Sequence, residues 1–221
     1  MFQNNKPVVA IDGTAGSGKG TLAKKLAEVL NYDHLDSGLL YRILAYEFLN
    51  LNKDLEKLIK VDIDLNIFLE KKKIKKINLR SSEITKISSE IAKLKFVRQK
   101  LISLQRKFAN FPPNGIGSVI DGRDITSVIT PLAEIKFYID ADVKIRAKRR
   151  LLQLDLPKES YNRVLKELIQ RDIQDKSRKI SPLIQTEDSH YINTGKINES
   201  EVLAKAINYI KKKQILFSDC I

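Results

Sequence analysis

The nine residues GTAGSGKGT, from Gly13 to Thr21, constrain the fold of this chain more than any other stretch. They nearly match the pattern G-x-x-x-x-G-K-[ST], in which a glycine-rich loop joins a strand to a helix and binds phosphate. The flanks fit that context. The run PVVAI (7–11) is short, apolar and β-branched, which predicts a buried strand, and leucines recur at helical spacing over 19–30. The sequence therefore predicts a strand, a phosphate-binding loop and a helix.

Gly20 departs from the pattern, because this position normally carries a hydroxyl and Thr21 supplies one a residue later. Without a side chain, position 20 cannot bind magnesium directly, so waters, carboxylates and phosphates must hold the metal. Lys19 is expected to reach the terminal phosphates of the ligand, at a helix N-terminus that favours anions. The residues of this predicted phosphate loop are Gly13, Thr14, Ala15, Gly16, Ser17, Gly18, Lys19, Gly20 and Thr21.

Further apolar runs at 32–35, 116–121, 135–140 and 190–194 predict four more strands, separated by helical patterns. Alternating strands and helices predict an α/β fold: a parallel five-stranded sheet with helices on both faces. We expect one domain with a core of about 1–50, 111–148 and 179–221. A helix-rich insert (about 51–110) would form an acceptor-side subdomain, and about 149–178 a lid.

Composition limits the remaining possibilities. The 221 residues contain a single cysteine, Cys220, which excludes an internal disulfide. No apolar run approaches the roughly 20 residues needed to cross a bilayer, and we find no signal peptide, so we expect a cytoplasmic protein. The net charge of +13 fits nucleic acid, an anionic membrane or small polyanions. The lysine-rich run 70–80 is interpreted as an exposed face.

Charged residues cluster where the predicted strands end. DSGLLYR (36–42) follows the second strand, and DGRDI (121–125) ends the third. Arg98 and Arg106 lie in the stretch 88–108, and Arg171, Asp175 and Arg178 are spaced to share a helix face. A lone arginine is usually a surface ion pair. Several arginines at a phosphate-binding edge favour a polyphosphate site.

Six segments together resemble the successive motifs of bacterial cytidylate (CMP) kinases: GTAGSGKGT, DSGLLYR, SSEIAKLKFVRQKLISLQRKF, DGRDITSVITP, RAKRRLLQL and RDIQDKSRKISPL. The form G-x-x-G-x-G-K-G-T is also that of nucleoside monophosphate kinases in general. The resemblance covers the chain except about 51–77, where this chain is shorter and richer in lysine than the family usually is.

The resemblance implies a P-loop NTPase-type sheet and a transfer of phosphoryl from ATP to CMP or dCMP. It places ATP on the loop from Gly13 to Thr21. Around the acceptor phosphate it places Ser37, Tyr41, Arg42, Arg123 and Arg178. Cytosine would be read by Ser89, Arg106 and Asp124, and the ribose held by Arg171 and Asp175.

The acceptor oxygen is already ionised at neutral pH, so no general base is needed, and catalysis must come from alignment and charge. The candidate catalytic residues are Lys19, Arg123, Arg146, Arg171 and Arg178, with Mg²⁺ held through water by Asp36 and Asp121. The expected partners are ATP, CMP and dCMP, without nucleic acid or membrane, and the expected state is a monomer.

Two alternatives stay open. The chain could be a nucleotide kinase that uses UMP, AMP or a mixture. It could also be a non-enzymatic RNA-binding protein on the same fold, although an intact Lys19 and Asp121 and the lack of an aromatic-rich basic strand face argue against that. His34 and His190 fall at strand positions and are assigned no role.

Overall fold

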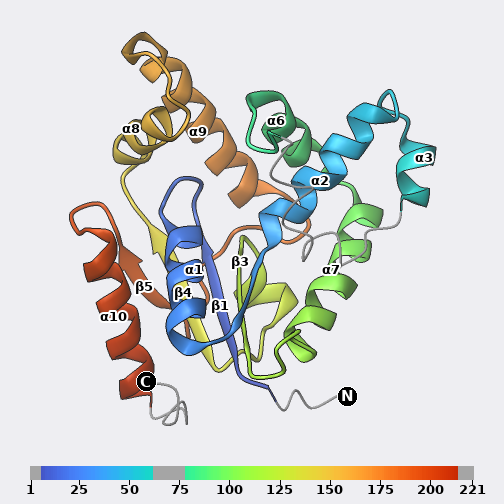
Figure 1. Ribbon diagram of the computed structural model, residues 1–221. Helices are drawn as coiled ribbons and strands as arrows, with labels where there is room; N and C mark the ends of the chain where they lie inside the picture. Colours follow the sequence, from blue (N-terminus) through green and yellow to red (C-terminus); the bar gives the residue numbers. More distant parts are fainter. Residues whose placement is uncertain (1–5, 62–77, 214–221) are drawn as a thin grey trace. The chain divides into compact units, whose positions relative to one another are not determined.

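A computed structural model describes residues 6–61 and 78–213 (Figure 1). Its sheet has five strands in the order β2-β3-β1-β4-β5. The strands are β1 (Val8–Gly13), β2 (Asp33–Asp36), β3 (Ser118–Gly122), β4 (Ile135–Asp140) and β5 (His190–Asn193). β1 runs parallel to both β3 and β4, and β4 runs parallel to β5. The predicted five-stranded α/β sheet is confirmed, with strand ends shifted by one or two residues.

Helices connect these strands in the described part of the chain. Their bounds are α1 (Lys19–Leu30), α2 (Ser37–Asn50), α3 (Leu55–Lys60), α6 (Ser82–Ile91), α7 (Lys95–Asn110), α8 (Val143–Gln153), α9 (Tyr161–Ser177) and α10 (Glu199–Lys212). Two short helices complete the set: a π-helix, η1 (Ile125–Ile129), and a 3₁₀ helix, η2 (Lys158–Ser160).

Local sequence explains where several helices start and stop. Asp36 caps α2 by accepting from the Leu39 amide at 3.1 Å. Asn198 and Glu201 form a reciprocal capping box at the start of α10. Asn31 ends α1 in the left-handed conformation, with φ 54°. These caps satisfy backbone groups at the helix ends and so set where the helices begin and end.

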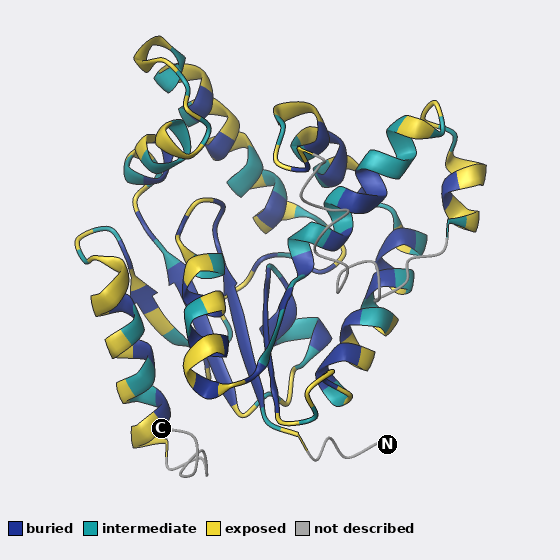
Figure 2. Cartoon of the chain, in the orientation of Figure 1, coloured by how far each residue is buried: buried dark blue, intermediate teal, exposed yellow. Residues whose placement is uncertain are grey.

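The core of the sheet is apolar and continuous. All residues of β1 and β3 are buried, and so are all residues of β4 except the last. Figure 2 shows these strands in dark blue. Helices α1 and α10 pack together and share one hydrophobic cluster with the strands. Burying the β-branched strand residues makes the sheet a rigid support for the loops at its carboxyl edge.

The chain divides into two compact units. The first comprises Met1–Leu35 and Arg106–Ile221, and contains almost the whole sheet. The second, Asp36–Gln105, contains α2, α3, α6 and most of α7, with α2 packed against α6 and α3. The predicted roles of 51–110 as an acceptor-side subdomain and 149–178 as a lid stay predictions.

Some sequence predictions lie outside the described residues. These are residues 62–77 of the shortened insert (about 51–77), most of the lysine-rich run 70–80, and Cys220. Within the residues that the structure does describe, no helix combines the length and apolar character needed to cross a membrane.

Candidate active site

The glycine loop after β1 is held through its carbonyl groups. The Ser17 hydroxyl donates to the Thr14 carbonyl at 3.0 Å, and the Thr194 hydroxyl donates to the Ser17 carbonyl at 2.7 Å. Arg146 Nη1 donates to the Ala15 carbonyl at 3.1 Å. The Thr14 hydroxyl donates to Asp140 at 2.5 Å. Carbonyls engaged by the protein turn away from a bound anion, as an amide-lined phosphate site requires.

The glycines of the loop meet two different constraints. At Gly13 a Cβ would lie 2.1 Å from the Ile139 carbonyl oxygen of the neighbouring strand, so no side chain fits there. Gly16 and Gly18 have φ of 75° and 92°, the left-handed region that side chains rarely adopt. Gly18 also caps α1, whose first residue is the half-buried Lys19. The predicted phosphate loop therefore adopts a conformation that requires glycine at positions 13, 16 and 18.

Asp121, at the end of β3, lies against the first turn of α1. A Cβ on Gly20 would be 3.6 Å from Asp121 Oδ2, so the missing side chain at position 20 leaves room beside this carboxylate. The other oxygen, Oδ1, is 2.8 Å from His34 Nε2. The sequence analysis assigned His34 no role, and its partner lies 87 positions away in the chain.

Magnesium would find oxygen ligands here, which suits its preference. In the described part of the chain, no three His, Cys, Asp or Glu side chains gather as a protein-only metal site would need.

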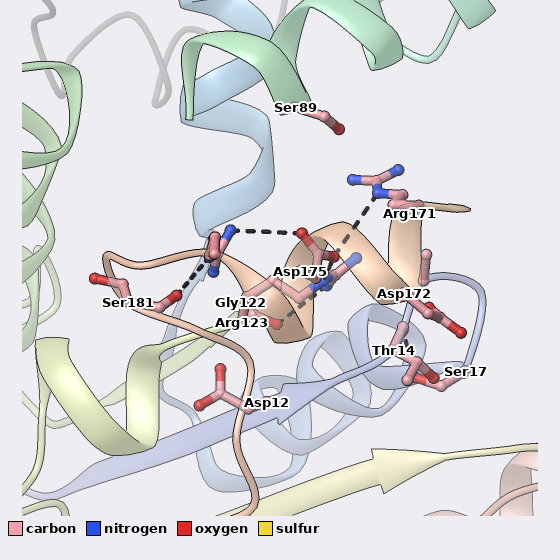
Figure 3. Close-up of polar contacts among 12 residues, drawn as sticks. Asp12, Thr14, Ser17, Ser89, Gly122, Arg123, Arg171, Asp172, Asp175 and Ser181 are labelled. Carbon is pink, nitrogen blue, oxygen red and sulfur yellow. Dashed lines mark hydrogen bonds and ion pairs between the residues drawn. The ribbon is translucent and has the colours of Figure 1, made fainter. Parts of the chain in front are cut away.

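Three arginines converge on one buried carboxylate. Asp175, on the last turn of α9, accepts from Arg123 Nε at 2.8 Å and lies 3.4 Å from Arg178 Nη1 and 4.0 Å from Arg171 Nε. Figure 3 shows the side chains of Arg123, which directly follows β3, and of Arg171, on α9, directed toward Asp175. Burial alone would raise the pKa of Asp175, but the three guanidiniums lower it. With three cations around one anion, the cluster keeps a positive excess.

Arg178 differs from the sequence prediction in its local structure. The spacing placed it on the same helix face as Arg171 and Asp175, but α9 ends at Ser177. Arg178 is extended, with φ −65° and ψ 140°, and its Nε donates to the Ser181 carbonyl at 2.5 Å. The turn after the helix, and not helical periodicity, brings Arg178 back to Asp175.

Arg146 is occupied by protein groups. It is buried, and besides Ala15 it donates to the Ala141 carbonyl at 2.7 Å and to both oxygens of Asp172, at 3.2 and 2.6 Å. It thus connects α8, the glycine loop and α9. Its predicted catalytic role is not tested by these contacts.

The loop after β3 continues into the π-helix η1. Asp124 is buried at the start of η1, and its carbonyl accepts from the amides of Val128 and Ile129. At the other end of η1, Arg106 donates to the carbonyls of Val128 and Ile129, at 2.8 and 3.2 Å. The predicted cytosine readers therefore meet the two ends of one short helix that the sequence did not predict: Asp124 directly precedes η1, and Arg106, on α7, binds its last carbonyls.

The remaining predicted acceptor residues lie in the second unit. Asp36 is 3.9 Å from Arg42 Nη1 and 3.6 Å from Arg80 Nη2. Ser37 is buried at the start of α2, and the buried Arg98 lies over the Tyr41 ring, 5.7 Å from its centroid. On α6, the Ser89 hydroxyl donates to the Thr85 carbonyl at 3.1 Å.

Comparison with known proteins gives one consistent family. Residues 9–212 match the family described as Cytidylate kinase. A cytidylate kinase of Bartonella bacilliformis is 39% identical over 214 residues, which cover 93% of this chain and 95% of that protein. A cytidylate kinase of Paramagnetospirillum magneticum is 34% identical over 94% of this chain and 99% of its own length. One from Salmonella paratyphi B is 34% identical over 95% of this chain and 97% of its own.

Solved structures share the fold at lower identity. An uncharacterised protein from Eubacterium ventriosum superimposes with a TM-score of 0.55 at 19% identity, over 93% of this chain and 99% of that one. A protein of Thermus thermophilus gives a TM-score of 0.50 at 15% identity, over 95% and 98%. These likenesses concern the arrangement of the backbone.

Proposed function

The chain belongs to the cytidylate kinase family, and from this premise we propose that it transfers the terminal phosphoryl group of ATP to CMP or dCMP. The products are ADP and CDP or dCDP. The observation that carries the proposal is the arginine cluster on Asp175, because it sets an excess of positive charge near the end of β3. The family gives no support to the RNA-binding alternative.

The donor nucleotide is assigned to the glycine loop. Its carbonyls are bound by Ser17, Arg146 and Thr194, which supports a role for its amides in holding phosphate. The dipole of the twelve-residue helix α1 adds positive potential at Lys19. The positive charge of Lys19 would stabilise the phosphoryl group during its transfer.

The acceptor phosphate is assigned to Arg123 and Arg178, together with Ser37, Tyr41 and Arg42 of the second unit. Neighbouring guanidiniums on Asp175 are held in place before the substrate arrives, so little side-chain entropy is lost when an anion binds. No residue needs to remove a proton, because the attacking phosphate oxygen is already ionised. Alignment of the two nucleotides and stabilisation of charge are the contributions of the protein.

Arg171 and Asp175 are assigned to the ribose as well. Asp175 would accept from the 3′-hydroxyl, which CMP and dCMP both carry, while Arg123 and Arg178 hold its carboxylate ionised. Arg146 would serve the donor side through the Ala15 carbonyl that it holds.

Magnesium is assigned to Asp121 and Asp36 through water. The room beside Asp121 at position 20 supports this assignment. When bound, the ion would offset the negative charge of the donor phosphates. His34 would keep the Asp121 carboxylate oriented from the opposite side.

Cytosine is assigned to Asp124, Arg106 and Ser89. A carboxylate accepts from the cytosine amino group, whereas uracil would oppose it with a second acceptor. Arg106 would donate to the ring nitrogen or carbonyl of cytosine. A site whose buried polar groups are left unpaired by uracil rejects UMP strongly.

The test is an assay of ADP release with each nucleoside monophosphate in turn. We expect CMP and dCMP to be preferred over UMP by more than about tenfold in kcat/KM, and Asp124→Ala to lose most of that preference, in line with roughly 1–3 kcal/mol for such a contact. Equal use of CMP and UMP by the wild-type protein would reduce the assignment to a general pyrimidine kinase. A further expectation is a monomeric, cytoplasmic enzyme.

A further inference from the structure

Asp12 is a fully buried carboxylate inside the otherwise apolar strand β1, and the proposed function does not use it. Its side chain has 0% exposure, and it lies one residue before Gly13 and the phosphate loop. A buried charge is costly unless hydrogen bonds compensate for it. The question is which part of the protein that carboxylate holds.

Within residues 6–61 and 78–213, the hydrogen bonds of the Asp12 side chain all go to the start of η1. Oδ1 accepts from the Ile125 amide at 3.0 Å, and Oδ2 accepts from the Thr126 amide at 2.8 Å and the Thr126 hydroxyl at 2.7 Å. These are the first residues after Asp124. Amides in the first turn of a helix lack partners within the helix. Asp12, on strand β1, accepts from these amides and so caps η1. Figure 3 shows its carboxylate at the carboxyl end of β1.

The other end of η1 is bound by Arg106, through the carbonyls of Val128 and Ile129. The helix is thus held between a carboxylate at its start and a guanidinium at its end. Asp124 is the residue directly before those that Asp12 binds, and Arg106 itself binds the carbonyls at the other end. The distance between the two predicted base-reading groups is therefore set by how η1 is fixed.

We propose that Asp12 is a positioning residue for nucleotide selectivity, which fixes η1 so that Asp124 and Arg106 stand at the separation that cytosine requires. The proposal rests on the cytosine-reading role given to this pair under the proposed function. It assigns to β1 two tasks, carrying the donor-phosphate loop and aligning the acceptor-base loop. Asp12 acts through Asp124 and does not touch the base.

Three variants test the proposal. Asp12→Asn keeps the size of the side chain but replaces one accepting oxygen by an NH₂ group, which then opposes the amide of Ile125 or that of Thr126. Thr126→Val removes one hydroxyl at nearly constant volume, whereas the control Thr126→Ser keeps the hydroxyl and removes only a methyl group. For each variant and the wild type, kcat/KM is measured with CMP and UMP, together with KM for ATP and the melting temperature.

We expect Asp12→Asn to lower the CMP-to-UMP ratio by about tenfold, within the discrimination one base contact provides, while KM for ATP changes by less than about threefold. Thr126→Val should lower the ratio by a smaller factor, and Thr126→Ser should keep it. Added to Asp124→Ala, the change Asp12→Asn should leave the ratio where Asp124→Ala put it, because coupled residues are not additive.

The outcomes separate the two proposals. A wild-type protein that prefers CMP, beside a folded Asp12→Asn variant with an unchanged ratio, overturns the inference and leaves the proposed function standing. If Asp12→Asn does not fold, the ratio of Thr126→Val decides in its place. A wild-type protein without preference overturns the cytosine-reading role and, with it, the role of Asp12.

Discussion

We expect the donor side to depend on Lys19 more than on any other residue. It is the first residue of α1, half-buried, and directly follows the left-handed Gly18. We expect Lys19→Ala to lower kcat by at least about a hundredfold, because electrostatic contacts to a developing charge typically carry ~3–4 kcal/mol. The melting temperature should stay near that of the wild type. Near-normal kcat in a folded variant would remove the phosphate loop from the mechanism.

Asp12 makes the stability of the protein depend on pH. Burial raises the pKa of its carboxyl from 3.8 to about 6, although hydrogen bonds from Thr126 and Ile125 oppose the rise. The folded chain therefore binds this proton more tightly than the unfolded chain does. That contribution to stability is fully present below pH 3.8 and is lost as the pH rises through about 6.

We expect the difference in unfolding free energy between the wild type and Asp12→Asn to shrink by roughly 2–3 kcal/mol from about pH 4 to about pH 7, since one pKa unit corresponds to about 1.4 kcal/mol. Urea denaturation of both proteins at several pH values measures this difference. A difference that grows with pH would mean that the hydrogen bonds outweigh burial and that the pKa of Asp12 is lowered.

At the scale of elements, α9 and the turn after it assemble the arginine cluster. We expect Asp175→Ala to weaken CMP and dCMP alike, by at least about tenfold in kcat/KM, because three guanidiniums lose the carboxylate that gathers them. Steady-state kinetics with both nucleotides measure this. A variant that spared dCMP and impaired CMP alone would show that Asp175 reads the 2′-hydroxyl.

The strands were the elements that sequence predicted best. Apolar β-branched runs such as 7–11 and 135–140 bury both faces in a parallel sheet, and that burial is a local property of the sequence. The glycine loop was predictable for the same reason, because its conformation depends on residues that lie next to each other.

Other features depend on contacts between distant residues and were missed. The π-helix η1 has five residues, too few for a periodic pattern, and it is held by Asp12 from 113 positions away. His34 looked structural until β2 and β3 brought it to Asp121. The pairing of Arg146 with Asp172 likewise joins two helices, 26 positions apart. A single sequence offers no signal for these partners, although a charged residue inside the apolar run VVAIDG was a sign that Asp12 needed one.

At the scale of the whole molecule, ATP is assigned to residues of the first unit alone, whereas CMP is assigned to residues of both units. The predicted ATP residues 13–21 all belong to the first unit. The predicted CMP residues are divided, with Arg123, Asp124 and Asp175 in the first unit and Ser37 and Arg42 in the second. Each ligand should therefore leave a different pattern of protection, because a bound ligand suppresses local opening where it binds.

Hydrogen exchange measures this pattern. With ATP alone, we expect amides of 13–21 to exchange at least about tenfold more slowly while those of 37–42 stay unchanged. With CMP alone, both 37–42 and 122–126 should be protected, and UMP at the same concentration should protect them less, because Asp124 would face an acceptor. The variant Lys19→Ala supplies the control, since it should weaken protection by ATP and leave protection by CMP intact. If CMP slowed exchange in the first unit alone, the assignment of Ser37, Tyr41 and Arg42 to the acceptor phosphate would be wrong, and the arginine cluster on Asp175 would have to bind that phosphate by itself.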